Sequence, residues 1–155
     1  MAIRTGMEFH GTLWCVDDFQ GADPPDVLTV AAGVVGSDLV EQVFRSNCRE
    51  YLGSSLFHLK MRSHEAAALE WPCLMDMIFL DAGHSAEDVR CDIDLWWPLL
   101  KEGGVLCGHD YGVSMFPGIQ VEVDSFAEKK GLSVVAPADT LLWAITKVTH
   151  QPVEA

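Results

Sequence analysis

Met75–Leu80 reads MDMIFL, and Asp81 follows it directly. A short apolar run between polar residues is typical of a strand that is covered on both faces of a parallel sheet, so a strand is predicted over 75–81. Leu13–Asp17 reads LWCVD and likewise ends at an acidic residue. Further apolar runs at 56–61 and 104–108 resemble these two. The four segments predict the parallel core of one sheet.

Helical patterns alternate with these strands. Ala86–Leu100 repeats apolar residues at intervals of three and four, and Pro98 predicts a kink or a last irregular turn near its end. Other helices are predicted over 38–52, 63–71 and 117–130. In the first of these, the expected inner face consists of Leu39, Val43, Phe44 and Tyr51. The alternation predicts an α/β fold with a Rossmann-like, doubly wound sheet. Two β-rich runs, 132–135 and 141–147, predict a C-terminal antiparallel hairpin.

The bulk composition limits the classes of partner. The chain has 155 residues, which predicts one domain over 1–150 and a tail over 151–155. It carries 10 Lys and Arg against 23 Asp and Glu, a net charge of −13, which repels nucleic-acid phosphates and anionic membranes. No apolar run approaches the ~20 residues of a membrane span, and the N-terminus lacks a signal-peptide pattern, so a cytoplasmic location is expected. Five cysteines without C-x-x-C spacing argue against a disulfide framework or a structural zinc site.

Polar residues follow three of the four predicted strands. They are Asp17-Asp18, Asp81-Ala82-Gly83-His84 and Gly108-His109-Asp110-Tyr111. Ligands of a doubly wound sheet gather beyond the carboxyl ends of its parallel strands, so these residues predict a site for a polar ligand or a hard metal. Structural interpretations stay open beside this one. Asp17 suits a turn, and Asp81 with His84 suits an Asx-type turn before a helix capped by Ser85.

The stretch 76–126 reads DMIFLDAGHSAEDVRCDIDLWWPLLKEGGVLCGHDYGVSMFPGIQVEVDSF. It resembles the second half of a branch of class I S-adenosylmethionine (SAM) dependent methyltransferases. That branch reads D-G-x-H-S-Y-E, then P-G-G-x-x-x-G-H-D-Y, and its distant relatives include macrocin-type and catechol-type O-methyltransferases. The likeness covers about 12–147, is dense over 76–126 and is weaker around 22–55.

The resemblance implies a set of cofactor-binding residues. Asp17 matches the acidic residue that binds the SAM ribose hydroxyls. Ser63 and Arg62 match the segment that edges the adenine, and Asp81 is assigned to the cofactor as well as to a metal.

The resemblance also implies a metal and a base. Asp81, His109 and Asp110 match positions that hold Mg²⁺, or lie beside it, in metal-dependent relatives. Oxygen ligands suit Mg²⁺, whereas His109 shifts the preference toward Mn²⁺, Fe²⁺ or Zn²⁺. His84 and His109 are the candidate catalytic residues. His84 is the candidate general base, because an imidazole accepts a hydroxyl proton near neutrality.

One departure from the family stands out. Members carry a strand ending in an E-x-G-x-x-x-G loop ahead of the segment equivalent to LWCVDD, and here eleven residues precede Thr12. We therefore expect an N-terminally truncated domain without this first strand and glycine loop. The sheet order of the fold places the missing strand between 13–17 and 75–80. A second copy of the chain or a missing N-terminal segment is the partner expected to fill the gap.

The sequence thus favours SAM-dependent O-methylation of a small molecule, with possible assistance from a metal. One alternative is a catalytically inactive remnant, or partner-binding domain, of the same fold. Another is a metal-binding hydrolase or hydroxylase-like protein that uses Asp81, His109 and Asp110 without SAM.

Overall fold

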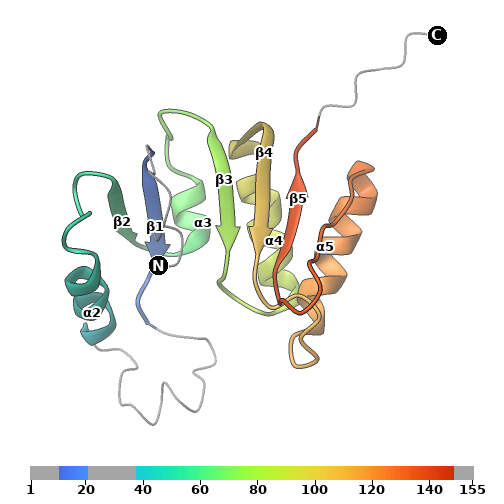
Figure 1. The fold of residues 1–155 in the computed structure, drawn as a ribbon, viewed down its shortest axis with the longest axis horizontal. Helices are drawn as coiled ribbons and strands as arrows, with labels where there is room; N and C mark the ends of the chain where they lie inside the picture. The colour runs from blue at the N-terminus through green and yellow to red at the C-terminus, as the bar shows by residue number, and fades with distance from the viewer. Residues whose placement is uncertain (1–10, 21–37, 149–155) are drawn as a thin grey trace. The chain divides into compact units, whose positions relative to one another are not determined.

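A computed structural model describes residues 11–20 and 38–148 (Figure 1). Residues 1–10, 21–37 and 149–155, which include the predicted tail over 151–155, lie outside these ranges. The chain divides into two compact units, 1–62 and 63–155, and each is described by itself. None of the described helices has the length and apolarity that a bilayer crossing requires.

The described residues of the first unit, 11–20 and 38–62, form a two-stranded parallel sheet and one helix. Strand β1 (Leu13–Asp17) pairs with β2 (Leu56–Lys60), in a register that runs from Leu13↔Leu56 to Asp17↔Lys60. Helix α2 (Leu39–Cys48) stands between them in sequence. The two predicted strands are confirmed, and the helix ends four residues earlier than predicted.

The predicted inner face of α2 is partly wrong. Leu39 and Val43 are each about half exposed, whereas Phe44 lies against the buried ring of Phe19, with ring centroids 5.6 Å apart. His58 of β2 completes this aromatic cluster, 5.7 Å from Phe44. Aromatic contacts with the turn after β1 therefore fix the orientation of the helix more than its aliphatic residues do.

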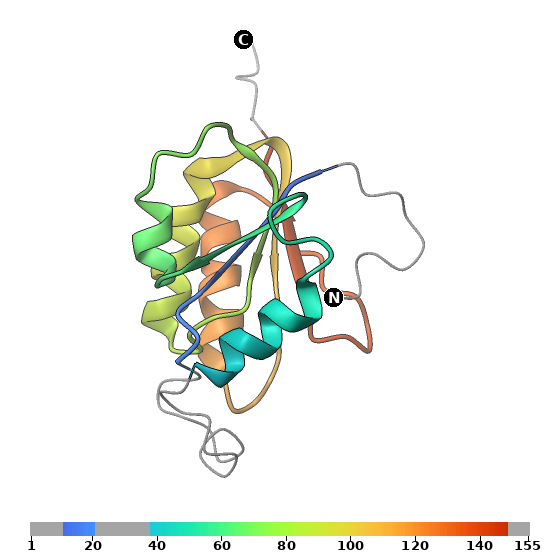
Figure 2. The same cartoon turned by 90° about the vertical axis from the view of Figure 1, so that its left-hand side faces the viewer.

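The second unit is a three-stranded sheet in the order β3-β4-β5. Strands β3 (Met75–Leu80) and β4 (Leu100–Gly108) are parallel, and β5 (Trp143–Thr146) is antiparallel to β4. Within this unit the three helices α3 (Ser63–Ala67), α4 (Ala86–Trp96) and α5 (Pro117–Lys130) cover one face of the sheet (Figure 2). The buried core between the layers includes Ile78, Leu106 and Ile145 of the strands and Ile93 and Val123 of the helices.

The irregular last turn predicted at Pro98 is confirmed, although α4 itself ends four residues before the predicted Leu100. Helix α4 ends at Trp96, a 3₁₀ turn covers Trp97–Leu99 around Pro98, and the strand begins at the fully buried Leu100. Pro98 has no backbone N–H to continue the helix, which explains the early end. Gly103 and Gly104 lie inside β4, where the register with β3 shifts between Met75 and Met77.

The C-terminal hairpin is shorter than predicted. In the described part of the chain, the two β-rich runs meet at one antiparallel bridge, Val135↔Ala144, with two backbone hydrogen bonds of 2.9 Å. The second run pairs mainly with β4, as β5. The last strand is thus antiparallel as expected, but β4 and not 132–135 is its main partner.

The α/β architecture with parallel strands is confirmed, and the single continuous sheet is not. Among the described residues β1 and β3 are each the outer strand of their own sheet, because β1 pairs with β2 alone and β3 with β4 alone. These are the two strands that the resemblance predicted to flank a missing central strand.

Candidate functional site

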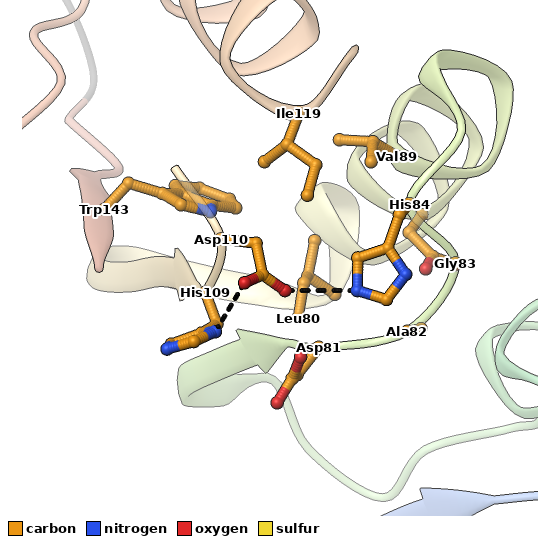
Figure 3. A pocket seen from close by; sticks show the side chains of 11 residues that line it. Leu80, Asp81, Ala82, Gly83, His84, Val89, His109, Asp110, Ile119 and Trp143 are labelled. Atoms are coloured by element: carbon orange, nitrogen blue, oxygen red, sulfur yellow. Dashed lines mark hydrogen bonds and ion pairs between the residues drawn. The ribbon is translucent and has the colours of Figure 1, made fainter. Parts of the chain in front are cut away.

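A pocket lies at the carboxyl ends of β3 and β4 in the second unit (Figure 3). Its polar lining consists of Asp81, His84, Asp92, His109 and Asp110. Its apolar lining includes Val89, Ile119 and Trp143. The pocket volume is about 20 Å³, roughly the room for a water molecule or an ion. The strand ends therefore form a polar site of the kind that the topology of a doubly wound fold favours.

Asp110 lies between two imidazoles (Figure 3). Its Oδ2 is 3.1 Å from His84 Nε2, and its Oδ1 is 3.1 Å from His109 Nδ1. Its side chain is 16% exposed, and its backbone φ is +61°. A non-glycine residue with positive φ is uncommon, and Asp is among the residues that tolerate it best. The backbone after β4 therefore turns so that one carboxylate contacts both histidines.

The loop after β3 positions His84. The helix that follows begins with Ser85 as its N-cap, whose hydroxyl oxygen accepts a hydrogen bond from the Asp88 amide at 3.1 Å. The His84 ring stacks on Phe116, with centroids 4.2 Å apart and planes 22° apart. The capping role considered for Ser85 is thus present, and it holds His84 at the pocket.

Three of the polar groups are close enough to share one cation. Ligand atoms of Asp81, His84 and Asp110 all lie within 4.8 Å of one another. His109 was predicted in this set and is not part of it, although it contacts the other oxygen of Asp110. His84, which was predicted as the general base, is the histidine of this group instead, because the loop after β3 brings its ring back over the end of β4.

The backbone at the end of β4 allows the close packing of the pocket. A Cβ at Gly108 would lie 2.6 Å from the Leu80 carbonyl oxygen and 2.7 Å from Trp143. The His109 amide donates to the same Leu80 carbonyl at 3.2 Å. Glycine is therefore required where β4 passes between β3 and the indole of Trp143.

Asp92 is a pocket residue that the sequence analysis did not single out. It lies on α4 and is 8% exposed, and its Oδ1 accepts a 2.6 Å hydrogen bond from Ser63 Oγ. Ser63 Oγ in turn accepts from Trp96 Nε1 at 2.8 Å. Burial raises the pKa of the Asp92 carboxyl, against the opposing effect of the Ser63 hydrogen bond. One feature of the sequence could have indicated this residue. Asp92 is an acidic residue next to Ile93, on the apolar face of a helix whose other charges face water.

The candidate cofactor residues of the first unit have partners of their own. Asp17 Oδ1 accepts a 2.6 Å hydrogen bond from the amide of Phe19, whose φ is +58°. Arg62 Nε lies 3.6 Å from Asp18 Oδ2. The turn role considered for Asp17 is thus present, and it occupies one carboxylate oxygen.

Tyr111 follows the Asp110 turn, and its hydroxyl donates to Asp124 Oδ1 at 2.6 Å. Burial, together with this hydrogen bond, raises the pKa of Tyr111 to about 12. The Tyr111 amide also donates to the Leu141 carbonyl at 2.9 Å. These contacts hold the loop after β4 against α5 and the segment before β5.

Comparison with known proteins gives one family and one fold. A sequence model described as a methyltransferase domain matches residues 1–111. A search among curated proteins found no match. The fold is similar to that of the O-methyltransferase NovP, with a TM-score of 0.67 and 18% identity over 92% of this chain and 62% of that one.

Two further solved structures are similar. The first is a putative caffeoyl-CoA O-methyltransferase from Staphylococcus aureus, with a TM-score of 0.60 and 14% identity over 87% of this chain and 74% of that chain. The second is the SAH-bound methyltransferase PaMTH1 of Podospora anserina, with a TM-score of 0.58 and 13% identity over 88% and 72%. The chain thus spans only 62% of NovP and a larger share of the other two.

Proposed function

Because the chain belongs to the methyltransferase-domain family, we propose that it is a SAM-dependent O-methyltransferase that acts on a small molecule. The observation that carries the proposal is the contact of 3.1 Å between His84 and Asp110 at the carboxyl ends of β3 and β4. The site places a proton acceptor and a carboxylate beside each other in a pocket.

In the proposed reaction the oxygen of a substrate hydroxyl attacks the methyl carbon of SAM. The O–C bond forms as the S–C bond breaks, and the sulfonium becomes the thioether of S-adenosylhomocysteine (SAH). His84 accepts the hydroxyl proton. Asp110 orients the imidazole by accepting from Nε2–H, which leaves Nδ1 as the basic nitrogen, and it stabilises the imidazolium that forms.

The same residues fit a divalent cation. Two carboxylates and one imidazole, with ligand atoms within 4.8 Å of one another, form a donor set for Mg²⁺, Mn²⁺, Fe²⁺ or Zn²⁺. We propose Asp81, His84 and Asp110 as its ligands, with His109 as a neighbour that contacts Asp110. Such an ion would lower the pKa of a bound substrate hydroxyl and orient its oxygen. His84 cannot be both ligand and base through the same nitrogen, so metal affinity separates the two roles.

The proposal assigns four residues to the cofactor, on the basis of the resemblance. In the first unit, Asp17 is proposed to bind the ribose hydroxyls through the oxygen that the Phe19 amide leaves free. Arg62, whose guanidinium lies beside Asp18, is proposed to lie near the adenine. In the second unit, Ser63 is proposed for the adenine edge and Asp81 for the cofactor side of the pocket.

Binding of SAH tests the proposal and does not require that the methyl acceptor be identified. Ligand-observed NMR detects dissociation constants into the millimolar range, and the D17A and D81A variants are expected to weaken the signal at least tenfold. D76N is the matched control, because Asp76 is exposed and pairs with Lys101. If the wild-type chain binds no SAH at several millimolar, and addition of a polypeptide that carries the missing strand and glycine loop does not restore binding, the O-methyltransferase proposal fails in favour of a catalytically silent domain.

A further inference from the structure

Asp92 is a buried carboxylate that the proposed reaction leaves without a role. The residue is 8% exposed, and its Oδ1 accepts a hydrogen bond from Ser63 Oγ at 2.6 Å. In the described part of the chain, no Lys or Arg is among the groups that shift its pKa. The charges of Asp88 and His64 have opposite effects on this pKa, and burial outweighs both. A buried charge without a cation beside it is costly, so this carboxylate is suited to a cation from outside the chain.

Asp92 lines the same pocket as the three proposed ligands of a cation. Ligand atoms of Asp81, His84 and Asp110 lie within 4.8 Å of one another, and Asp92 is a further acidic residue of the pocket lining. The pocket volume of about 20 Å³ corresponds to a single ion or water molecule. Asp92 does not belong to the compact group, so it is not assigned as a direct ligand. Its negative charge acts on an ion in this pocket without coordination.

The second oxygen of Asp92 is open. Among the described residues, Ser63 is the one donor to this carboxylate, and it contacts Oδ1. Every fully buried side-chain oxygen or nitrogen in this part of the chain has a hydrogen-bond partner, so Oδ2, which has none, keeps some access to solvent. Because Asp92 lines the pocket, its free oxygen is available to the space in which a cation would be held.

We propose that Asp92 is the charge-balancing residue of the cation site, where it strengthens the binding of a multivalent cation to Asp81, His84 and Asp110 without being a ligand. The inference rests on the cation site of the proposed function, and it adds a third carboxylate to the two among the ligands. Ser63 holds this carboxylate in place. The Trp96 indole N–H occupies the Ser63 oxygen at 2.8 Å, which leaves the hydroxyl hydrogen for Asp92.

The test compares Mn²⁺ with Tb³⁺, because a role through charge depends on the charge of the ion. Dissociation constants are measured for the wild type, D92N and D94N. Electron paramagnetic resonance detects free Mn²⁺, and luminescence excited through an indole detects bound Tb³⁺, since Trp143 lines the pocket. D92N keeps the shape of the side chain and removes its charge. D94N is the matched control, because it removes the same charge from an exposed position of the same helix.

We expect D92N to weaken Mn²⁺ binding about tenfold, which is within the range typical of residues that surround metal ligands. The loss for Tb³⁺ should be about thirtyfold, because Coulomb attraction grows in proportion to the charge of the ion. D94N should change each constant less than about threefold, because its charge is exposed to solvent. Thermal melts should show D92N to be at least as stable as the wild type at pH 7, since a buried charge is removed.

The two ions separate a role through charge from a structural one. Equal losses for Mn²⁺ and Tb³⁺ in D92N would indicate a packing role and overturn the inference, and so would losses no larger than those in D94N. Absence of Mn²⁺ binding to the wild type would overturn the inference together with the cation site. Binding of SAH, which is measured without the ion, decides the methyltransferase proposal separately. If D92N is unfolded, D92S replaces it, with the same expected losses and the same contradicting results.

Discussion

His84 Nε2 lies 3.1 Å from Asp110 Oδ2, although 26 residues separate the two in sequence. The loop after β3 and the turn after β4 create this contact, and each is fixed by a specific local feature. One is the stacking of His84 on Phe116, and the other is the positive φ of Asp110. The contact serves either as a base with its orienting carboxylate or as part of a cation site.

Metal affinity distinguishes these two roles. Because Asp81, His84 and Asp110 form the compact group, H84A is expected to weaken Mn²⁺ binding at least tenfold, and H109A less than threefold. The measurement is an electron paramagnetic resonance titration of free Mn²⁺. A larger loss of Mn²⁺ affinity in H109A than in H84A would support the ligand set predicted from the sequence, Asp81, His109 and Asp110. Equal Mn²⁺ binding by the wild type and D110A would exclude the cation site.

The stability of D92N should depend on pH in a defined direction. The folded pKa of Asp92 lies above its ordinary value of 3.8, so the folded wild type holds this proton more tightly than the unfolded chain. The resulting stabilisation is present below pH 3.8 and is lost as the pH rises through the raised folded value. D92N removes the buried charge. Its free energy of unfolding, relative to that of the wild type, should therefore rise by about 1 kcal/mol between pH 3 and pH 7. Urea unfolding at both pH values checks this, and a difference that does not change with pH would contradict it.

Glycine is needed at Gly108 and at Gly112 for different reasons, close packing at the first and backbone conformation at the second. A Cβ at Gly108 would contact Leu80 and Trp143 at 2.6–2.7 Å, whereas Gly112 has a φ of +78° and open space around it. We expect G108A to lower the free energy of unfolding by more than about 2 kcal/mol and G112A by about 1 kcal/mol. Chemical denaturation measures both values. Equal losses would mean that β4 moves to accommodate a methyl group at no cost.

The phenol of Tyr111 should titrate late. Its pKa is raised to about 12, first by burial and then by the hydrogen bond to Asp124. In a Y51F background, which leaves Tyr111 as the single tyrosine, absorbance at 295 nm should show little tyrosinate at pH 11. D124N should lower the midpoint toward 10, because the neighbouring charge is removed. A midpoint near 10 in the Y51F chain would contradict the described contact.

Strand positions followed from the sequence because the apolar runs are short and end abruptly at polar residues. The runs at 13–17 and 75–80 match β1 and β3 directly. The start of β4 did not follow, since Leu100 continues the helical repeat of α4 and its membership of the strand depends on pairing with Met75. Local pattern alone cannot decide such a residue, because tertiary contacts override propensity.

The candidate site was predicted as a group of residues but not in its internal arrangement. Strand ends indicated that Asp81, His84, His109 and Asp110 would gather at one edge. Which histidine joins the two carboxylates depends on the loop after β3 and on the φ of Asp110, and neither has a signature in the sequence. Asp92 was not predicted, because one acidic residue on the apolar face of a helix belongs to none of the strand-end groups that indicated the site.

We expect the 155-residue chain by itself to bind SAM weakly, with a dissociation constant no tighter than about 0.1 mM. No E-x-G-x-x-x-G loop precedes Leu13–Asp17, because the one match to this spacing, Glu102–Gly108, lies inside β4, and in the described residues the outer edges of β1 and β3 have no strand beside them. Contacts to the methionine half of SAM through such a loop contribute several hydrogen bonds, and those to charged groups amount to ~1.5–3 kcal/mol each. Loss of two would shift a micromolar site by about 3–6 kcal/mol, and 1.4 kcal/mol is a factor of ten. Addition of a polypeptide that carries the missing strand and loop should restore binding at least a hundredfold, whereas a peptide of the same composition in scrambled order should not. Isothermal titration of the chain with SAM, with and without each peptide, measures the effect. A dissociation constant in the low micromolar range for the chain alone would show that its own residues replace the glycine loop.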